Sequence, residues 1–184
     1  MRNWLFALAV AMMAHNAAAE QTVWRIDSNR SEAHFKVTLR VPIKAEGRFT
    51  SIEGEVNVLP NQKRNVRVHV NANELRMGGP AWLQKATVSA EFLDAKNYPN
   101  IDFQSADFSE QILLSGGDIK GMLSIKGIRR AVVFSIKPSS CKRAGLSCPI
   151  DVSGTLKRSD FKMNAYRWSL KDEVRFHFQL KFIE

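Results

Sequence analysis

Strict alternation of apolar and polar side chains in the C-terminal stretch 174–183 constrains the fold more than any other feature. The apolar positions there are Val174, Phe176, Phe178, Leu180 and Phe182. Successive side chains of a β-strand point to opposite faces, so a strand gathers all five on one face, whereas a helix would scatter them. The stretch therefore predicts a strand with one apolar face and one solvated face.

The same alternation recurs upstream, in residues 33–41, 66–73, 131–136 and 150–156, with weaker candidates at 47–59, 101–105, 111–114 and 119–125. Turn-forming residues separate these segments, as in Leu59-Pro60-Asn61-Gln62, Ser115-Gly116-Gly117-Asp118 and Lys126-Gly127-Ile128. Many short strands joined by hairpins are typical of an all-β sandwich or barrel. About eight antiparallel strands close into a barrel without exposed edges, and its interior is either packed or holds one small ligand.

One segment, residues 80–96, departs from this pattern and predicts a single short helical insertion. Its latter half has helical character, with Thr87 or Ser89 as the N-terminal cap. The side chains expected to face inward are Phe92, Leu93 and Ala95. Pro99 would follow the end of the helix, since the residue before a proline avoids helical geometry. A helix inserted in such a barrel often covers an open end.

The N-terminus has the pattern of a signal peptide. A charged start at Arg2 precedes an apolar stretch, residues 4–14, and then Ala17-Ala18-Ala19. We predict cleavage after Ala19, which leaves one domain of residues 20–184 in the periplasm. The alternative is an uncleaved anchor, but the apolar stretch is shorter than the roughly 20 residues that a membrane-spanning helix needs.

The two cysteines, Cys141 and Cys148, predict a disulfide, because an exported chain meets an oxidising compartment. A loop this short would gain about 2.5 kcal/mol of stability on the chain-entropy model. A metal site and a pair of reactive thiols are the alternatives. Neither a nearby histidine nor a Cys-x-x-Cys spacing supports them.

The formal net charge of +9 favours anionic partners, among them nucleic acid, phosphorylated lipid and membrane surfaces. The charges are dispersed over the polar faces of the expected strands, which indicates a solvated basic surface. An exported protein rarely meets nucleic acid, so we expect none as a partner.

No pattern in the chain indicates catalysis or a bound metal. Three histidines, His34, His69 and His177, lie on polar faces of expected strands, and each is most simply a solvated residue. Motifs of hydrolases, metalloproteases and phosphate-binding loops are absent from the sequence. We therefore predict no catalytic residues and no metal ligands.

Phenylalanines dominate the apolar faces and suggest a wide apolar interior. The residues expected to line it are Phe35, Val37, Phe49, Val68, Phe103, Leu123, Phe134, Phe176 and Phe178. An interior too long to fill would form a tunnel for a linear apolar ligand, and each buried methylene contributes about 0.8 kcal/mol. Periodicity does not separate this tunnel from a solid core.

Several motifs follow one another in a characteristic order and spacing: Trp24-Arg25-Ile26-Asp27, Gly47-Arg48-Phe49, the stretch from Glu91 to Ser105, Gly121 to Ile128, and Leu156 to Phe161. In this order and spacing they resemble the YceI-like family. The resemblance implies an eight-stranded, lipocalin-like antiparallel barrel with a tunnel for a polyisoprenoid, such as an isoprenoid quinone or a polyprenyl phosphate. Two departures concern the tunnel mouth: Arg30 replaces a histidine common in the family, and Gly79-Pro80-Ala81-Trp82 stands where an Arg-Asp-x-His-Leu run is frequent. Head-group specificity therefore does not carry over.

The function expected from these observations is non-catalytic binding, sequestration or transport of an isoprenoid lipid, with no further cofactor. A transient contact with a membrane surface and a homodimer stay open. One alternative is a solid barrel that acts as an interaction module. Another is an enzyme for a small apolar substrate, which would need an ionisable side chain inside the barrel.

Overall fold

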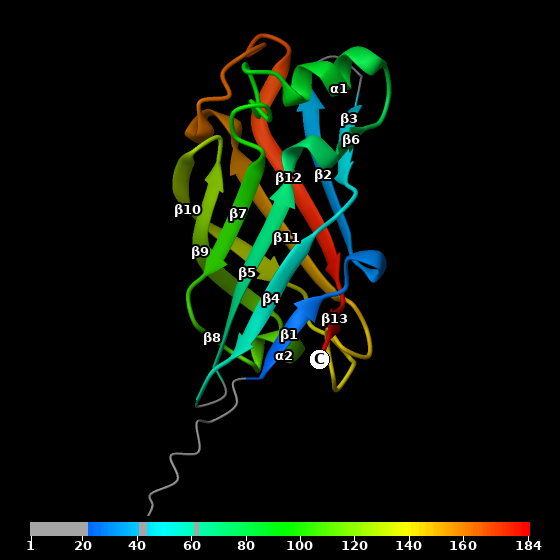
Figure 1. Cartoon of the computed structure of the whole chain (residues 1–184), viewed down its shortest axis with the longest axis vertical. Coiled ribbons are helices and arrows are strands. Elements are labelled where there is room, and N and C mark those ends of the chain that lie inside the picture. The colour runs from blue at the N-terminus through cyan, green and yellow to red at the C-terminus, as the bar shows by residue number, and fades with distance from the viewer. Residues whose placement is uncertain (1–21, 41–43, 61–62) are drawn as a thin grey trace, which may run out of the picture.

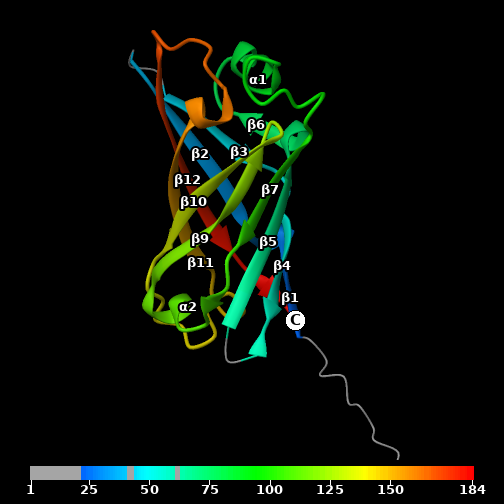
Figure 2. The same cartoon turned by 90° about the vertical axis from the view of Figure 1, so that its left-hand side faces the viewer.

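The computed structural model describes residues 22–40, 44–60 and 63–184, and the signal-peptide prediction lies outside these residues, as do Val41, Asn61 and Gln62. One antiparallel sheet curls into an elongated barrel (Figures 1 and 2). Its strand order is β13-β1-β4-β5-β7-β9-β10-β11-β12-β2-β3-β6, with the short β8 paired to β5.

Thirteen strands are described, where the sequence predicted eight. Their bounds are β1 Val23–Ile26, β2 Glu32–Leu39, β3 Lys44–Phe49, β4 Glu53–Val58, β5 Lys63–Asn71, β6 Leu75–Met77, β7 Asn100–Ser105, β8 Phe108–Ser109, β9 Gly117–Ile125, β10 Ile128–Ile136, β11 Ile150–Lys157, β12 Leu170–Leu180 and β13 Phe182–Ile183. The larger number arises because five of the barrel's long strand positions, which we call staves, are each interrupted and so made of two strands. The 3₁₀ helices η1 (Ser28–Arg30) and η3 (Ala72–Glu74) separate β1 from β2 and β5 from β6. When β3 is also joined with β4, β7 with β8 and β12 with β13, the staves number eight, as predicted. Each stave pairs with its neighbours in sequence.

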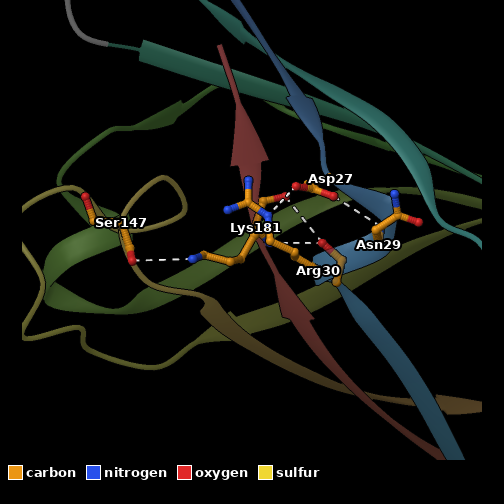
Figure 3. Close-up of polar contacts among 6 residues, drawn as sticks. Asp27, Asn29, Arg30, Ser147 and Lys181 are labelled. Carbon is orange, nitrogen blue, oxygen red and sulfur yellow. Dashed lines mark hydrogen bonds and ion pairs between the residues drawn. The ribbon is translucent and has the colours of Figure 1, made fainter.

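The barrel closes where the first and last staves meet. β12 pairs with β2, and β13 pairs with β1, whose other neighbour is β4. Lys181 lies between β12 and β13, and its backbone bridges the interruption (Figure 3). Its carbonyl accepts from the Asp27 amide at 2.8 Å, and its own amide donates to the Ser31 hydroxyl at 3.0 Å. Asp27 in turn pairs with Arg30, so η1 is held at this seam.

Pairing registers confirm the alternation that the sequence predicts. Phe176 lies opposite Phe35, Val174 opposite Val37, and His177 opposite His34. An antiparallel pair places opposite residues on the same face of the sheet. Apolar and polar side chains thus collect on the inner and outer walls respectively.

The helix prediction was wrong in its position. Helix α1 spans Ala81–Val88, the first half of the expected segment, and Ser89 follows it as the C-terminal cap. Pro80 fits the position before the first helical turn, where no amide donor is needed, and good helix formers follow it. Near the end of α1 the Thr87 hydroxyl donates to the Leu83 carbonyl rather than capping an N-terminus.

A second short helix, α2 (Ile112–Ser115), replaces the weak strand expected at 111–114. Leu113, on α2, is buried against the barrel core. Alternation over four residues is too short to distinguish a strand from one helical turn, so the prediction failed there. Within residues 22–40, 44–60 and 63–184, no helix combines the length and apolar character needed to cross a bilayer.

Candidate ligand-binding cavity

The barrel encloses a cavity of about 540 Å³. This volume is within the range of about 300–1,000 Å³ typical of small-molecule sites. All nine residues that the sequence placed on the interior line it: Phe35, Val37, Phe49, Val68, Phe103, Leu123, Phe134, Phe176 and Phe178. The alternative of a solid core is therefore wrong. The inner wall is rich in aromatic side chains, as the sequence suggested.

Glycines inside the strands explain why so many large side chains leave a hollow centre. Gly154 lies opposite Phe134, and a Cβ added to Gly154 would lie 2.3 Å from the Phe134 ring. Gly47 stands in the same relation to Phe35, also at 2.3 Å. In each pair the ring approaches the bare backbone of the neighbouring strand closely, which is a known use of glycine in sheets. Part of each ring thus takes up space at the wall that a larger residue on the next strand would fill.

Aromatic contacts continue around this wall. Phe103 and Phe134 meet edge to face with ring centroids 5.2 Å apart, and Phe134 and Phe178 do so at 5.9 Å. Phe176 stacks on Phe178 at 6.1 Å and also contacts Phe35 at 6.0 Å. Such pairs contribute about 0.5–1.5 kcal/mol each beyond area burial. A continuous band of rings therefore holds the wall in shape around the cavity.

The end of the cavity next to α2 is closed by buried side chains. Those that line the cavity there are Phe108, Leu113, Ile119, Ile136, Ile150 and Phe182. Each of the six is at most 8% exposed. We call this end of the barrel the closed end.

The opposite end, which we call the open end, lies between α1 and the segment 158–169 that joins β11 to β12 (Figure 2, top). Three aromatic residues there line the cavity and also face solvent: Trp82 is 57%, Tyr166 46% and Trp168 78% exposed. Phe92 stacks on Tyr166 at 5.9 Å, so the chain after α1 touches the opposite segment across the opening. The cavity therefore reaches solvent at this end, past a narrow aromatic rim.

Arg158 is the one charged residue among the described residues of the cavity lining. Its side chain is buried, and its guanidinium donates to the carbonyls of Met163 at 2.7 Å and Ala165 at 2.6 Å. It also donates to the Lys171 carbonyl at 3.1 Å. Burial lowers the pKa of the guanidinium, with the Asp172 charge acting in the opposite direction. Arg158 thus holds the segment 158–169 in a loop at the rim, a role that the sequence did not reveal.

The three histidines lie on the outer wall, and none is among the described residues that line the cavity. Each contacts a carboxylate: His34 with Glu32 at 3.1 Å, His69 with Asp102 at 2.8 Å, and His177 with Asp151 at 3.0 Å. Among the described residues, no three His, Cys, Asp or Glu side chains are grouped so that they could hold a metal ion. The enzyme alternative thereby loses its best candidates for an inward-facing ionisable group.

Cys141 and Cys148 lie close together near the closed end, and both are free thiols in this structure. A hydrogen bond with Cys148 raises the pKa of the Cys141 thiol. Burial acts to raise the pKa of Cys148, but hydrogen bonds from Cys141 and Ser139 outweigh it and lower that pKa. The two sulfurs are thus near enough to interact, and the disulfide stays a prediction.

An eight-stave antiparallel barrel around an apolar lumen defines the lipocalin-like class of folds. Within that class the chain belongs to the YceI-like domain family, whose model matches residues 24–182. None of the curated proteins matches the chain in sequence.

Solved structures agree on the fold. Burkholderia cenocepacia BcnA superposes with a TM-score of 0.69 at 19% identity, over 86% of this chain and 99% of that one. A polyisoprenoid binding domain from Saccharophagus degradans, implicated in plant cell wall breakdown, gives 0.63 at 12% identity, over 86% and 97%. The Campylobacter jejuni YCEI protein gives 0.58 at 18% identity, over 75% and 84%. At these identities the similarity establishes the fold alone.

Proposed function

We propose that this protein binds an isoprenoid lipid in the barrel lumen and sequesters or transports it without catalysis. The observation that carries the proposal is the cavity itself, hollow and lined by apolar side chains from every stave. Membership of the YceI-like family and a structural neighbour named as a polyisoprenoid binding domain support the same class of ligand.

The energetics favour a long apolar chain. Each isoprene unit contributes five carbons, so its burial is worth about 4 kcal/mol before the cost of association, which is roughly 4–15 kcal/mol. Several units are therefore needed for tight binding. The tail would run toward the closed end, and the polar head would stay at the open end, where Arg158, Ser169 and Thr87 supply the polar part of the lining.

We further propose that the protein acts in the periplasm, as a mature chain that begins at Glu20. The support is the N-terminal pattern of a charged start, an apolar stretch and Ala17-Ala18-Ala19. The mass of the protein recovered from a periplasmic extract tests this proposal, because an uncleaved chain would be heavier by the first 19 residues.

Organic extraction of the purified protein, followed by mass spectrometry, is the direct test of the ligand. A second measurement adds an isoprenoid quinone to lipid-free protein in mild detergent and follows its uptake. Val68→Trp, which projects a large side chain into the lumen, should lower uptake at least about tenfold, since it removes the space that the ligand occupies.

Val133→Trp is the matched control, because Val133 lies on the outer wall and is 45% exposed. It should leave uptake unchanged. If the wild-type protein carries no prenyl lipid and takes up none, the proposal is wrong. It is also wrong if the two tryptophan variants behave alike while both remain folded.

A further inference from the structure

The large exposed aromatic side chains of the described chain are all at the open end. They are Trp82, Tyr98, Tyr166 and Trp168. Tyr98 lies against the β9–β10 turn at Gly127, and the other three line the mouth of the cavity. Aromatic residues are normally the costliest to leave in water, so four at one end are a patch that requires an explanation.

Cations surround this patch. The segment 158–172 carries Arg158, Lys162, Arg167 and Lys171 with two acids, Asp160 and Asp172. Lys162, Arg167 and Lys171 are exposed, and Lys85 is exposed on α1, three residues from Trp82. None of these four exposed cations forms a salt bridge with a carboxylate in the described part of the chain. The rim of the open end is thus both aromatic and positively charged.

This combination fits the surface of an anionic bilayer. Tryptophan and tyrosine favour the depth of the lipid head groups, where the ring is partly dehydrated and its N–H or O–H stays hydrated. Each Lys or Arg near an anionic surface adds attraction that weakens over the screening length of the salt. If a protein docked at this end, the cavity mouth would face that protein. If a bilayer docks there, the mouth faces the membrane, which is the source of an isoprenoid lipid.

We propose that the open end docks on an anionic membrane, with Trp82 and Trp168 inserted among the head groups and the cavity mouth turned toward the bilayer. The biological reason for docking rests on the proposed function, because docking would let a lipid tail pass between the bilayer and the lumen without crossing water. Its geometry rests only on the exposed aromatics and cations of the rim.

Co-sedimentation of the lipid-free mature protein with vesicles tests the proposal. Vesicles of phosphatidylcholine and phosphatidylglycerol in equal parts should bind the protein, and vesicles of phosphatidylcholine alone should bind it far less. Trp82→Ser with Trp168→Ser should weaken binding about tenfold, because the apolar contact is lost. Lys162→Gln with Arg167→Gln should weaken it by about fivefold for each charge removed, and added salt should erase that difference.

Matched controls lie elsewhere on the barrel. Val133→Ser removes an exposed apolar side chain from the outer wall, and Lys137→Gln with Lys142→Gln removes two exposed cations from the closed end. These controls should bind vesicles as the wild-type protein does. If they lose as much binding as the rim variants, or if the wild-type protein does not bind anionic vesicles, the proposal is overturned.

The lumen variant separates this proposal from the proposed function. Val68→Trp should keep full vesicle binding while it loses quinone uptake. Conversely, Lys162→Gln with Arg167→Gln, at two residues that do not line the cavity, should keep uptake from detergent solution while it loses vesicle binding. If the wild-type protein binds vesicles but takes up no quinone, the proposed ligand is wrong and the docking proposal is retained.

Discussion

The two ends of this barrel are built from different kinds of contact. At the closed end, α2 and the strand ends bury Leu113, Ile150 and Phe182 together, and the buried Arg64 has a carboxylate partner, Glu110, at 2.8 Å. At the open end, the buried Arg158 holds backbone carbonyls instead, and tryptophans face solvent beside it. The closed end is thus packed like a protein core, whereas at the open end a loop is held by hydrogen bonds from one buried, charged side chain.

Backbone conformation divides the ends in the same way. Every described non-glycine residue with positive φ lies at the open end: Asp94, Lys126, Lys162 and Tyr166. At the closed end the positive φ angles belong to Gly116, Gly117 and Gly145. The left-handed region costs a non-glycine residue about 1–2 kcal/mol. Strain of this kind collects at functional sites, where the surroundings hold it in place. The rim segment 158–169, which contains Lys162 and Tyr166, therefore carries backbone strain that the closed end avoids.

Replacement of Arg158 should have the largest effect on this contrast. Arg158→Met leaves several buried carbonyls without a donor and should lower the free energy of unfolding by about 3 kcal/mol, measured by urea denaturation. Arg143→Met at the closed end removes an exposed ion pair with Glu184 and should cost less than about 1 kcal/mol. Equal losses at the two positions would mean that Arg158 does not support the rim.

The second prediction concerns whether a disulfide between Cys141 and Cys148 stabilises the closed end. Protein isolated under oxidising conditions should lack the two thiol hydrogens in an intact-mass measurement. Reduction, or Cys141→Ser with Cys148→Ser, should then lower the free energy of unfolding by about 2.5 kcal/mol without altering quinone uptake. Two thiols that stay reactive to alkylation in the untreated protein would contradict the prediction.

Substitution at a wall glycine should change the lumen between the two ends. Gly154→Ala pushes the Phe134 ring off the neighbouring strand, which should cost about 2 kcal/mol and lower quinone uptake as the ring enters the cavity. Adding Phe134→Leu should restore part of the uptake, because the smaller side chain leaves room for the new methyl group. No change in uptake for Gly154→Ala would show that the ring position does not govern the volume of the lumen.

Acid should weaken both ends by a small amount. At the open end, burial acts to raise the pKa of Asp172, but hydrogen bonds from the Ser159 hydroxyl and amide lower it overall. A carboxyl with a lowered folded pKa stabilises the protein above its unfolded pKa of about 3.9, and this stabilisation is lost as pH falls through the folded pKa. Asp172→Asn should therefore cost less than about 1 kcal/mol at neutral pH, with the difference shrinking below about pH 4.

Asp151, nearer the closed end, is the matched comparison. Hydrogen bonds from Gln179 and then His177 lower its pKa despite partial burial. Asp151→Asn should show the same acid dependence in urea denaturation. A difference that grows rather than shrinks toward low pH, for either variant, would contradict the direction of these pKa shifts.

Much of the fold could be predicted because strands are local patterns. The alternation at 174–183, 131–136 and 150–156 corresponds to β12–β13, β10 and β11. The errors fell on segments where the local pattern was short or mixed: α1 occupies the other half of its segment, and α2 replaces a weak strand. In both places contacts with the barrel end contribute to the choice of conformation. The side chain of Gln84, for example, ties α1 to β6 by bonding the Met77 amide and the Leu75 carbonyl.

The residues of the inner wall could likewise be predicted from the sequence, whereas the aromatic rim and the role of Arg158 could not. Trp82 lies at the start of α1 and Trp168 in the segment 158–169, far apart in the chain, and neither belongs to an alternating pattern. In the sequence Arg158 is one of many basic residues, and only the tertiary structure shows the carbonyls that it binds. The one overlooked signal was the presence of glycines inside strand patterns, at Gly47, Gly121 and Gly154, which indicates a close approach by a neighbouring side chain.

By itself, the sequence determined which side chains face inward, because alternation along a strand is a property of the strand alone. Whether those side chains fill the centre was decided by the tertiary structure, since it depends on what lies opposite each ring on the next strand. Phe35 meets Gly47 and Phe134 meets Gly154 only in the observed register. The hollow lumen, and the difference between its two ends, are thus consequences of pairing between residues distant in the chain.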